Sequence, residues 1–298
     1  MASVPHLLID ADIILYQTTA VCEQEADWSD GFATRWTDMR DVENTILDTL
    51  HHLFEKFDTE SYTMCLSDYH DPFRKRLADY YKESRDGSKK PLGYAQAVKL
   101  VEQKHPYERY PSLEADDVLG ILATSGRYDR PIIVSDDKDL KQIPGELYVP
   151  RLREHFRITP ESGFRFHMHQ TLTGDRADNY PGCPGIGEVR AERILDQPAN
   201  GDLWYAVEQT FAKARLPREE ALLQARLAKI LTTEWWNTET QEPILWTPSS
   251  KTPSVTVSSA DITSQPHVAA TIVSKPAATS TTAMPREKLK AKTTLRSR

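Results

Sequence analysis

The sequence is poor in cysteine and has no long apolar run. It contains three cysteines among 298 residues, and none of them stands in a CxxC pair. This scarcity excludes a disulfide framework and a zinc ribbon, and it favours reduced thiols in a cytoplasmic protein. No segment approaches the ~20 consecutive apolar residues of a membrane helix, so we expect no membrane partner. The hydrophobic content of 39% suffices for a globular fold with one large core or two modest ones.

An excess of positive charge is also missing, since the formal net charge is −7. A negative balance argues at first against a nucleic-acid partner. The charge is unevenly distributed, however: residues 72–90, here called the basic segment, carry Arg74, Lys75, Arg76, Lys82, Arg85, Lys89 and Lys90 against three acids. The basic segment is either a surface for a polyanion or an ordinary charged helix face.

Apolar runs and amphipathic stretches alternate along the first 150 residues. The runs predict strands at His6–Ile9, Tyr62–Leu66, Pro131–Val134 and Leu147–Val149. Helices are predicted between them, at Val42–Phe57, Gly93–Gln103, Leu113–Ala123 (with Ser112 as N-cap) and Leu140–Ile143. This alternation predicts an α/β fold, with a mostly parallel sheet and helices on both faces. Residues 23–39 fit a hairpin or a helical turn, and the sequence leaves both open.

The second half of the chain is organised around residues 172–195. Asp175 and Asp178 are three apart, a spacing that directs both carboxylates the same way from one helical turn. A glycine-rich turn at 182–187 follows, and a helix opens near Glu188. Glycines in front of a helix let backbone N–H groups approach a phosphate closely. The segment thus joins an acidic pair to a turn suited to a nucleic-acid backbone.

Two further helices are predicted at Leu203–Ala214 and Arg218–Leu231, before the composition changes at Thr247. The remaining residues are rich in Ser, Thr, Ala and Pro and lack aromatic side chains, which predicts a disordered tail. Its basic end, 286–298, either adds non-specific DNA affinity or keeps the protein in solution. The sequence identifies no partner for the tail.

Carboxylates gather where the predicted strands end and helices begin. In parallel sheets, ligands bind outside the carboxyl ends of the strands. The acids expected there are Asp10, Asp12, Asp68, Glu114, Asp116, Asp117, Asp136, Asp137, Asp139, Asp175 and Asp178. Asp10 is preferred over Asp12 because it closes the apolar run, and Asp136 is expected to point away from Asp137 and Asp139.

So many carboxylates repel one another unless cations neutralise them. Ligation by oxygen alone, without histidine or cysteine, suits Mg²⁺ or Mn²⁺ rather than zinc. Two such ions ~4 Å apart are the arrangement used to hydrolyse phosphodiesters. Beside them, Lys82 and Arg85 are candidates to neutralise charge on the scissile phosphate. Tyr80 and Tyr81 are candidates to stack on an unpaired base.

The order of these motifs resembles a known family. LIDAD near the start is followed by LSD at 66–68, YYKESR at 80–85, LEADD at 113–117, SDDKD at 135–139 and GDRADNYPGCPGIG at 174–187. Together they resemble the 5′→3′ exonucleases of bacteriophages, members of the flap endonuclease superfamily, over residues 5–195. The sequence departs from the family's motifs at two positions. Ala11 stands where the family often has glycine, and Asp136 stands where threonine is common. Neither departure removes a candidate ligand.

The resemblance implies a fold and a division into domains. A PIN-like nuclease core would span residues 1–150, including a helical arch in the basic region 69–110. A helical DNA-binding domain would span 151–246, with a helix–three-turn–helix element of the helix–hairpin–helix type at 172–195. The disordered tail would occupy 247–298.

The resemblance also implies the residues of the site. The metal ligands would be Asp10, Glu114, Asp116, Asp117, Asp137, Asp139, Asp175 and Asp178. Asp68 would be an additional active-site acid, and Lys82 and Arg85 would contact the reacting phosphate. The DNA contacts would come from Arg74, Lys75, Tyr80, Tyr81, Lys89, Lys90, Gly182, Gly185, Ile186, Gly187 and Arg190. The cofactors would be two Mg²⁺ ions, with Mn²⁺ as a substitute, and a K⁺ at the 182–187 turn.

The implied function is metal-dependent 5′→3′ exonuclease activity on duplex DNA, extending to flaps and RNA–DNA hybrids. A phage would use it in its host's cytoplasm for primer removal in replication or for host DNA degradation, and we expect a monomer. One alternative is a PIN-like ribonuclease, against which the GCPGIG turn argues. Another is a non-catalytic DNA-binding protein, which predicts gaps in the acid set. The sequence shows no such gap.

Overall fold

A six-stranded sheet forms the centre of the computed structural model, which describes residues 4–28, 31–85, 89–198 and 201–248. The strand order is β5-β4-β1-β6-β7-β8, and every pairing is parallel except the antiparallel pairing of β8 with β7. The bounds are β1 His6–Asp10, β4 Tyr62–Cys65, β5 Tyr107–Glu108, β6 Pro131–Val134, β7 Gly145–Val149 and β8 Glu154–Ile158. The predicted mostly parallel α/β sheet is confirmed.

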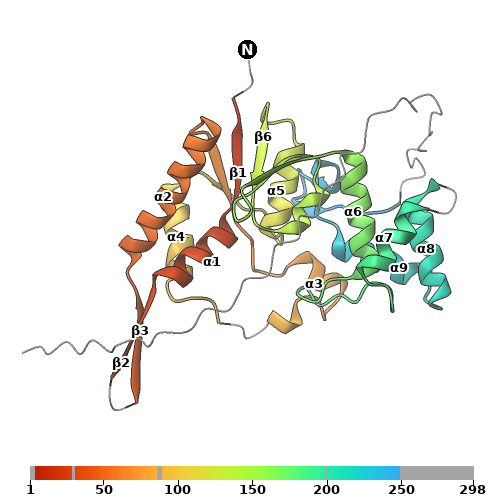
Figure 1. Cartoon of the computed structure of the whole chain (residues 1–298), viewed down its shortest axis with the longest axis horizontal. Coiled ribbons are helices and arrows are strands. Elements are labelled where there is room, and N and C mark those ends of the chain that lie inside the picture. Colours follow the sequence, from red (N-terminus) through yellow and green to blue (C-terminus); the bar gives the residue numbers. More distant parts are fainter. Residues whose placement is uncertain (1–3, 29–30, 86–88, 199–200, 249–298) are drawn as a thin grey trace, which may run out of the picture. The chain divides into compact units, whose positions relative to one another are not determined.

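Helices cover both faces of this sheet (Figure 1). One face packs against α1 (Ala11–Cys22), α2 (Met39–Phe57) and α4 (Tyr94–Lys104), and the other against α5 (Ala115–Thr124). The alternation of side chains along β1 explains this, because Leu7 and Ile9 face the first group and Leu8 faces α5. Burial on both faces accounts for the continuous apolar strands in the sequence.

Two helix starts differ from the predictions. The β1 strand does not continue to Asp12, because the Asp10 side chain accepts the N–H of Ile13 at 3.2 Å and caps α1. The N-cap of α5 is Glu114 rather than Ser112, whose φ of 59° places it in a turn. Both carboxylates therefore stand at helix N-termini, where the helix dipole favours negative charge.

The open alternative at residues 23–39 is resolved as a hairpin. β2 (Glu23–Trp28) pairs antiparallel with β3 (Phe32–Thr37), and Trp28 lies opposite Phe32. The aromatic side chains of Trp28, Phe32 and Trp36 are all exposed. Their four-residue spacing reflects positions on one face of two facing strands, not a helical stripe.

Helices also dominate the part of the chain after the sheet. α6 (Pro160–Thr173), α7 (Glu188–Asp196), α8 (Leu203–Lys213) and α9 (Arg218–Ala228) enclose a core that includes Leu172, Phe211 and Trp246. α7 and α8 lie where they were predicted, α9 is shorter, and α6 was not predicted. The shorter elements are α3 (Phe73–Leu77), η1 (Glu83–Arg85), η2 (Lys138–Gln142), η4 (Thr233–Trp235), β9 (Trp236–Asn237) and β10 (Glu242–Pro243).

The structure leaves the predicted domain limits and the predicted C-terminal tail untested. The domain limits stay a prediction, although the sheet itself extends to Ile158. Residues 249–298, and with them almost all of the predicted tail, lie outside the described residues. All three cysteines have free thiols, as expected. Within the described ranges, no helix is long and apolar enough to cross a membrane.

Candidate active site

Carboxylates from distant parts of the chain meet at the carboxyl ends of the central strands. Asp10 closes β1, Asp116 lies in the first turn of α5, and Asp137 follows β6. Asp10 accepts a hydrogen bond from Ser135 Oγ at 2.7 Å. Burial and the negative charges of Asp12 and Asp137 raise the pKa of Asp10 to about 7. The same causes, burial and then Asp137 and Asp10, raise the pKa of Asp116 well above its usual value.

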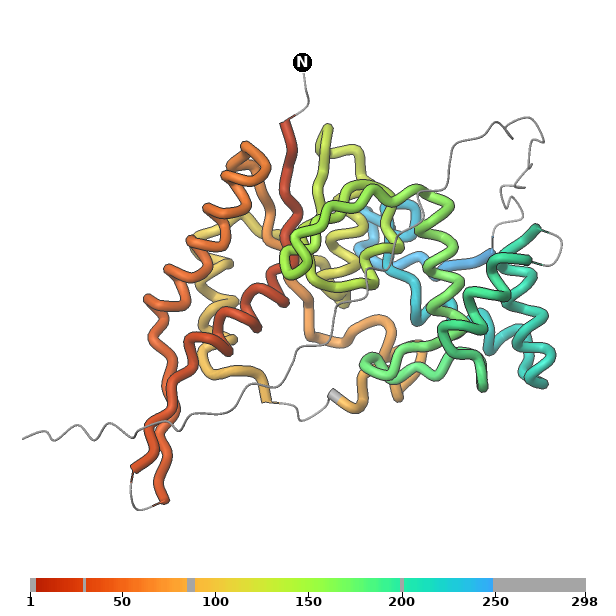
Figure 2. Tube along the Cα trace, in the orientation of Figure 1, coloured from red at the N-terminus to blue at the C-terminus, as the bar shows by residue number. Residues whose placement is uncertain are grey.

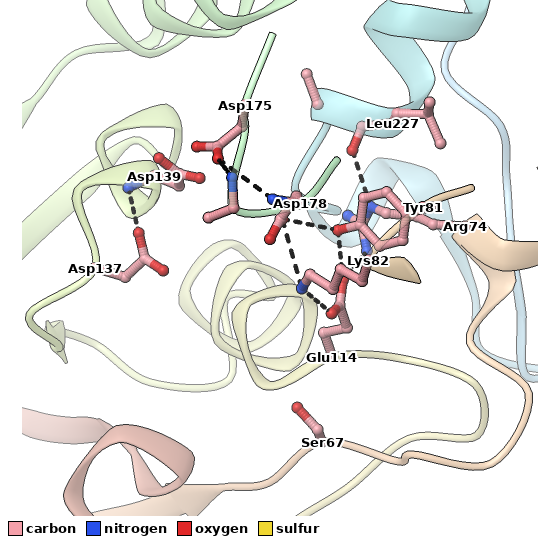
Figure 3. Close-up of polar contacts among 12 residues, drawn as sticks. Ser67, Arg74, Tyr81, Lys82, Glu114, Asp137, Asp139, Asp175, Asp178 and Leu227 are labelled. Atoms are coloured by element: carbon pink, nitrogen blue, oxygen red, sulfur yellow. Dashed lines mark hydrogen bonds and ion pairs between the residues drawn. The ribbon is translucent and has the colours of Figure 1, made fainter. Parts of the chain in front are cut away.

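The line of acids continues towards the loop after α6 (Figure 3). Burial and the neighbouring Asp137 raise the pKa of Asp139 to about 7, with Asp175 and Asp178 adding to the effect. Burial also raises the pKa of Asp137 itself. We call this set of acids the acidic row: Asp10, Asp116, Asp137, Asp139, Asp175 and Asp178.

The acidic row fits hard divalent cations. It offers only oxygen donors, which Mg²⁺ and Mn²⁺ prefer. The Oδ1 atom of Asp139 is buried and has no hydrogen-bond partner in the described part of the chain. Among the described residues, no three acidic, histidine or cysteine side chains converge tightly enough to hold an ion without rearrangement. Ion binding would therefore draw the row together and relieve the repulsion that raises these pKa values.

Lys82 of the basic segment lies beside this row. Its Nζ atom contacts Glu114 Oε1 and lies 3.5 Å from Asp178 Oδ2. Its backbone N–H donates to the carbonyl of Asp178 at 2.8 Å. Burial opposes ionisation of Glu114, but Lys82 and Arg74 outweigh it and lower the pKa of Glu114 to about 2. The Arg85 side chain, the other predicted phosphate contact, lies outside the described residues.

The predictions for Arg74 and Asp117 are wrong, because the two form a buried ion pair. Arg74 Nη1 and Nη2 each donate to one oxygen of Asp117 at 2.7 Å. Arg74 Nε also donates to the carbonyl of Leu227 at 3.1 Å, and Arg74 is 3% exposed. Arg74 is thus withheld from DNA, and both oxygens of Asp117 are withheld from a metal. The pair joins α3, α5 and the end of α9 in one network.

The structure also corrects the role of Tyr81 and shows the local contacts of Asp68. Tyr81 is buried, and its hydroxyl donates to Glu114 Oε2 and Asp178 Oδ2, each at 3.0 Å. It therefore orders two acids and has no ring face to offer a base. Asp68 accepts the backbone N–H groups of Ser112 and His70 at 2.9 and 3.0 Å. Its carboxylate closes a turn, and its role as an additional active-site acid stays a prediction.

Two other predicted DNA contacts, Lys90 and Tyr80, make contacts within the protein. The Lys90 ammonium lies 3.5 Å from the ring centroid of Tyr69 and 4.1 Å from that of Tyr94. These cation–π contacts hold Lys90 against the protein. Tyr80 is half-buried, and its carbonyl accepts from the side chain of Asn179 at 2.7 Å. Contacts of Lys75, Lys89 and Tyr80 with DNA stay predictions.

The segment around Asp175 is a tight loop rather than a helical turn. Asp175 and Tyr180 exchange backbone hydrogen bonds at 2.9 and 3.1 Å, and Asp175 Oδ1 accepts the N–H of Ala177 at 2.6 Å. Figure 2 shows this loop, in green, beside the orange trace of the basic segment. The backbone contact of Lys82 with Asp178 fixes that juxtaposition.

Among the three predicted DNA-binding glycines, Gly182 serves packing. It is buried with φ of 63°, and a Cβ there would lie 2.6 Å from the Thr173 carbonyl carbon and 2.7 Å from Leu172 O. The prediction that it contacts DNA is therefore wrong. Gly185 and Gly187 are exposed before α7, and Arg190 Nη1 donates to Gly185 O at 2.7 Å. Contacts of Gly185, Ile186, Gly187 and Arg190 with DNA stay predictions.

Alanine substitutions should separate these two kinds of glycine. We expect Gly182→Ala to lower the free energy of unfolding by several kcal/mol, on the order of 3, because the new methyl group meets fixed backbone at a positive φ. Gly187→Ala should change it by less than ~1 kcal/mol, because nothing lies within 4 Å of its Cβ position. Urea unfolding of both variants measures the difference. Equal stability of the two would contradict the packing role.

Comparison with known proteins identifies the family. Residues 5–162 match the family model described as 5′-3′ exonuclease, N-terminal resolvase-like domain. The chain belongs to the 5′-3′ exonuclease family. It is 27% identical to the exodeoxyribonuclease of Enterobacteria phage T3 over 287 residues, covering 82% of this chain and 93% of the relative. With the exonuclease of Escherichia phage T7 it shares 26% identity over 280 residues, covering 81% and 93%.

Membership of the 5′-3′ exonuclease family confirms the predicted enzyme class and its phage type. Among solved structures, the T5 D15 protein co-crystallised with metal ions is similar, with a TM-score of 0.55 and 16% identity. The likeness covers 76% of this chain and 89% of the T5 protein. At that identity it supports the fold alone, an α/β architecture with a mostly parallel sheet.

Proposed function

We propose that the protein is a divalent-metal-dependent nuclease that hydrolyses duplex DNA from its 5′ end. The observation that carries this proposal is the acidic row, which brings together acids from four separate parts of the chain and in which burial and neighbouring carboxylates raise the pKa values of Asp10, Asp116 and Asp139. A structural role would not require carboxylates that oppose one another's ionisation. The T5 D15 protein, similar in fold, has been crystallised with metal ions and, as a variant, with DNA and metal ions.

The proposed ligands are the acidic row together with Glu114. Two bound Mg²⁺ or Mn²⁺ ions would supply an activated water and stabilise the leaving oxygen. The chain's own residues position these groups. Ser135 orients Asp10, and Tyr81 orients Glu114 and Asp178. Lys82 neutralises Glu114 in the absence of substrate and is placed to donate to a phosphate oxygen of the substrate.

The DNA duplex is proposed to lie against the start of α7. Gly185 and Gly187 are exposed there, and helix N-termini with accessible N–H groups bind phosphate. A K⁺ held by carbonyls of the 182–187 turn remains part of this proposal, as do the arch, the helix–three-turn–helix element and the domain limits. Action on flaps and RNA–DNA hybrids is proposed from the resemblance to flap endonucleases.

Replacing Lys82 should affect turnover more than binding. We expect Lys82→Met to lower kcat by about 10²-fold while changing the dissociation constant for DNA less than about threefold, because its charge counts most when negative charge grows in the transition state. Single-turnover kinetics and a binding titration in Ca²⁺ measure the two quantities. Lys104→Met, at an exposed end of α4, is the control. Equal losses in both quantities would assign Lys82 to DNA binding instead.

The proposed function is tested with end-labelled DNA. Duplexes labelled at either the 5′ or the 3′ end are incubated with protein and Mg²⁺, and in parallel with EDTA. We expect early release of the 5′ label as short products, later release of the 3′ label, and no release in EDTA. Early release of the 3′ label, or equal activity in EDTA, would refute the proposal. An RNA duplex in a third reaction distinguishes the ribonuclease alternative.

A further inference from the structure

A cavity lies at the C-terminal end of α5, whereas Asp116 of the acidic row lies at the N-terminal end of this helix. Its volume is about 380 Å³, which falls within the range of small-molecule sites. The wall includes Thr124 at the end of α5, Pro160 at the start of α6 and the segment 229–235 after α9. It shares no lining residue with the acidic row.

Aromatic rings form much of the cavity wall. Trp235, Trp246 and Phe164 line it, together with two prolines. Trp246 is held edge-on against His167, with ring centroids 5.1 Å apart, and against Trp204 at 5.0 Å. Rings fixed in this way favour a flat, apolar ligand body, such as an aromatic heterocycle.

A buried cation also lines the cavity. Lys229 is only 8% exposed, and no hydrogen bond or ion pair of its ammonium group is found within the described ranges. Burial lowers its pKa to about 8, while Glu234 and Asp117 act in the opposite direction. The group thus remains mostly protonated at neutral pH. A buried ammonium beside an apolar cavity is stabilised by an anion that enters the cavity.

A buried histidine also contributes to the cavity wall. His167 is 1% exposed, and its Nε2 donates to the carbonyl of Ala225 at 2.8 Å. Nδ1 is therefore the unprotonated ring nitrogen, and it has no partner among the described residues. Burial and the charge of Lys229 lower the pKa of His167 to about 3, so the ring stays neutral. Nδ1 is itself buried, so a ligand in the cavity does not reach it and meets an uncharged ring.

We propose that this cavity binds a mononucleotide, with the phosphate on Lys229 and the base against the tryptophan rings. Each part of that ligand answers one feature of the cavity. An aliphatic acid would leave the aromatic wall unmatched, and an unphosphorylated nucleoside would leave the charge of Lys229 to be balanced by Glu234 alone within the cavity wall. Lys229 O also accepts from Arg74 Nη2 at 2.5 Å, so the ligand would contact a residue tied to the Arg74–Asp117 pair.

The test is calorimetric titration of the full chain in EDTA, where no hydrolysis occurs. The probes are dAMP, deoxyadenosine and inorganic phosphate. We expect dAMP to bind with a dissociation constant below about 1 mM, at least tenfold more tightly than either fragment. Lys229→Met should weaken dAMP binding at least tenfold, whereas Lys229→Arg, which keeps the charge, should largely preserve it. Lys213→Met, on the exposed end of α8, is the matched control.

These variants also separate the cavity from the acidic row. Lys229→Met should unfold at the same or a higher temperature, because it removes a buried charge, so lost binding would not reflect unfolding. Lys82→Met should leave dAMP binding unchanged, because Lys82 belongs to the proposed nuclease site. The proposal is overturned if dAMP does not bind, if phosphate alone binds as tightly, or if Lys229→Met binds dAMP like the native chain.

Discussion

Asp116→Asn is expected to abolish nearly all nuclease activity, with a fall in turnover on the order of 10³-fold. Burial raises the pKa of Asp116, and the neighbouring charges of Asp137 and Asp10 raise it further. The substitution keeps the shape of the side chain but removes the charge that would hold a divalent cation. In EDTA the same variant should be at least as stable as the native protein, because one source of repulsion is gone. Initial rates of 5′ label release and urea unfolding measure the two effects.

Asp136→Asn provides a control from the same acidic stretch. Asp136 accepts Arg151 N at 2.8 Å and Gln17 Nε2 at 3.2 Å, so each of its carboxylate oxygens has a partner outside the acidic row. An asparagine keeps one acceptor oxygen for Arg151 N and loses only the exposed hydrogen bond from Gln17, so we expect activity within about threefold of native. If Asp136→Asn and Asp116→Asn lost activity equally, or if Asp116→Asn remained active, the assignment of the acidic row would be wrong.

Arg74→Met is expected to destabilise the fold by about 3–5 kcal/mol, because it leaves Asp117 buried without its partner. The guanidinium also accounts for the hydrogen bonds to Leu227 O and Lys229 O. Activity should fall as well, because Glu114 loses one of the two cations that favour its ionised form. Chemical denaturation gives the change in the free energy of unfolding.

The neighbouring Arg76 supplies the comparison. Its guanidinium pairs with Asp71 near the surface at 2.6 Å, and exposed ion pairs contribute about 0–1 kcal/mol. Arg76→Met should therefore be nearly neutral. The double variant Arg74→Met, Asp117→Leu should recover part of the stability lost in Arg74→Met, because it removes the unpaired charge. A loss below about 1 kcal/mol in Arg74→Met would show that the pair does not hold α3, α5 and α9 together.

The parallel sheet and the clustering of acids at its strand ends could be predicted from the sequence, because both depend on local sequence patterns. Each central strand is a short apolar run, Asp10 ends one of them, and Asp137 lies three residues after the end of another. The rule that parallel strands present ligand-binding residues at their carboxyl ends then brings these acids together. The helices α1 and α6 were missed because ADIILYQTTAVC and PESGFRFHMHQTLT mix β-branched, aromatic and histidine residues without a clear helical period.

The partners within the site could not be read from local pattern. Arg74 and Asp117 are 43 positions apart, and both are residue types expected in a nuclease site. Only the packing of α3 against α5 and α9 shows that they satisfy each other. Tyr81 is similar, because a tyrosine in a basic segment suits stacking as well as a buried hydrogen bond. The family resemblance assigned Gly182 to DNA contact. Its close approach to Leu172 and Thr173 exists only in the folded loop, so the sequence pattern could not reveal its packing role.

The central claim is that the acidic row binds two divalent ions. It is tested most directly by counting Mn²⁺ ions bound to the full chain, using electron paramagnetic resonance of free Mn²⁺ during a titration. We predict two Mn²⁺ per chain at saturation, and weaker or fewer bound ions in Asp116→Asn and Asp139→Asn, with no change in Asp136→Asn. Absence of Mn²⁺ binding, or binding that is the same in all three variants, would contradict the account.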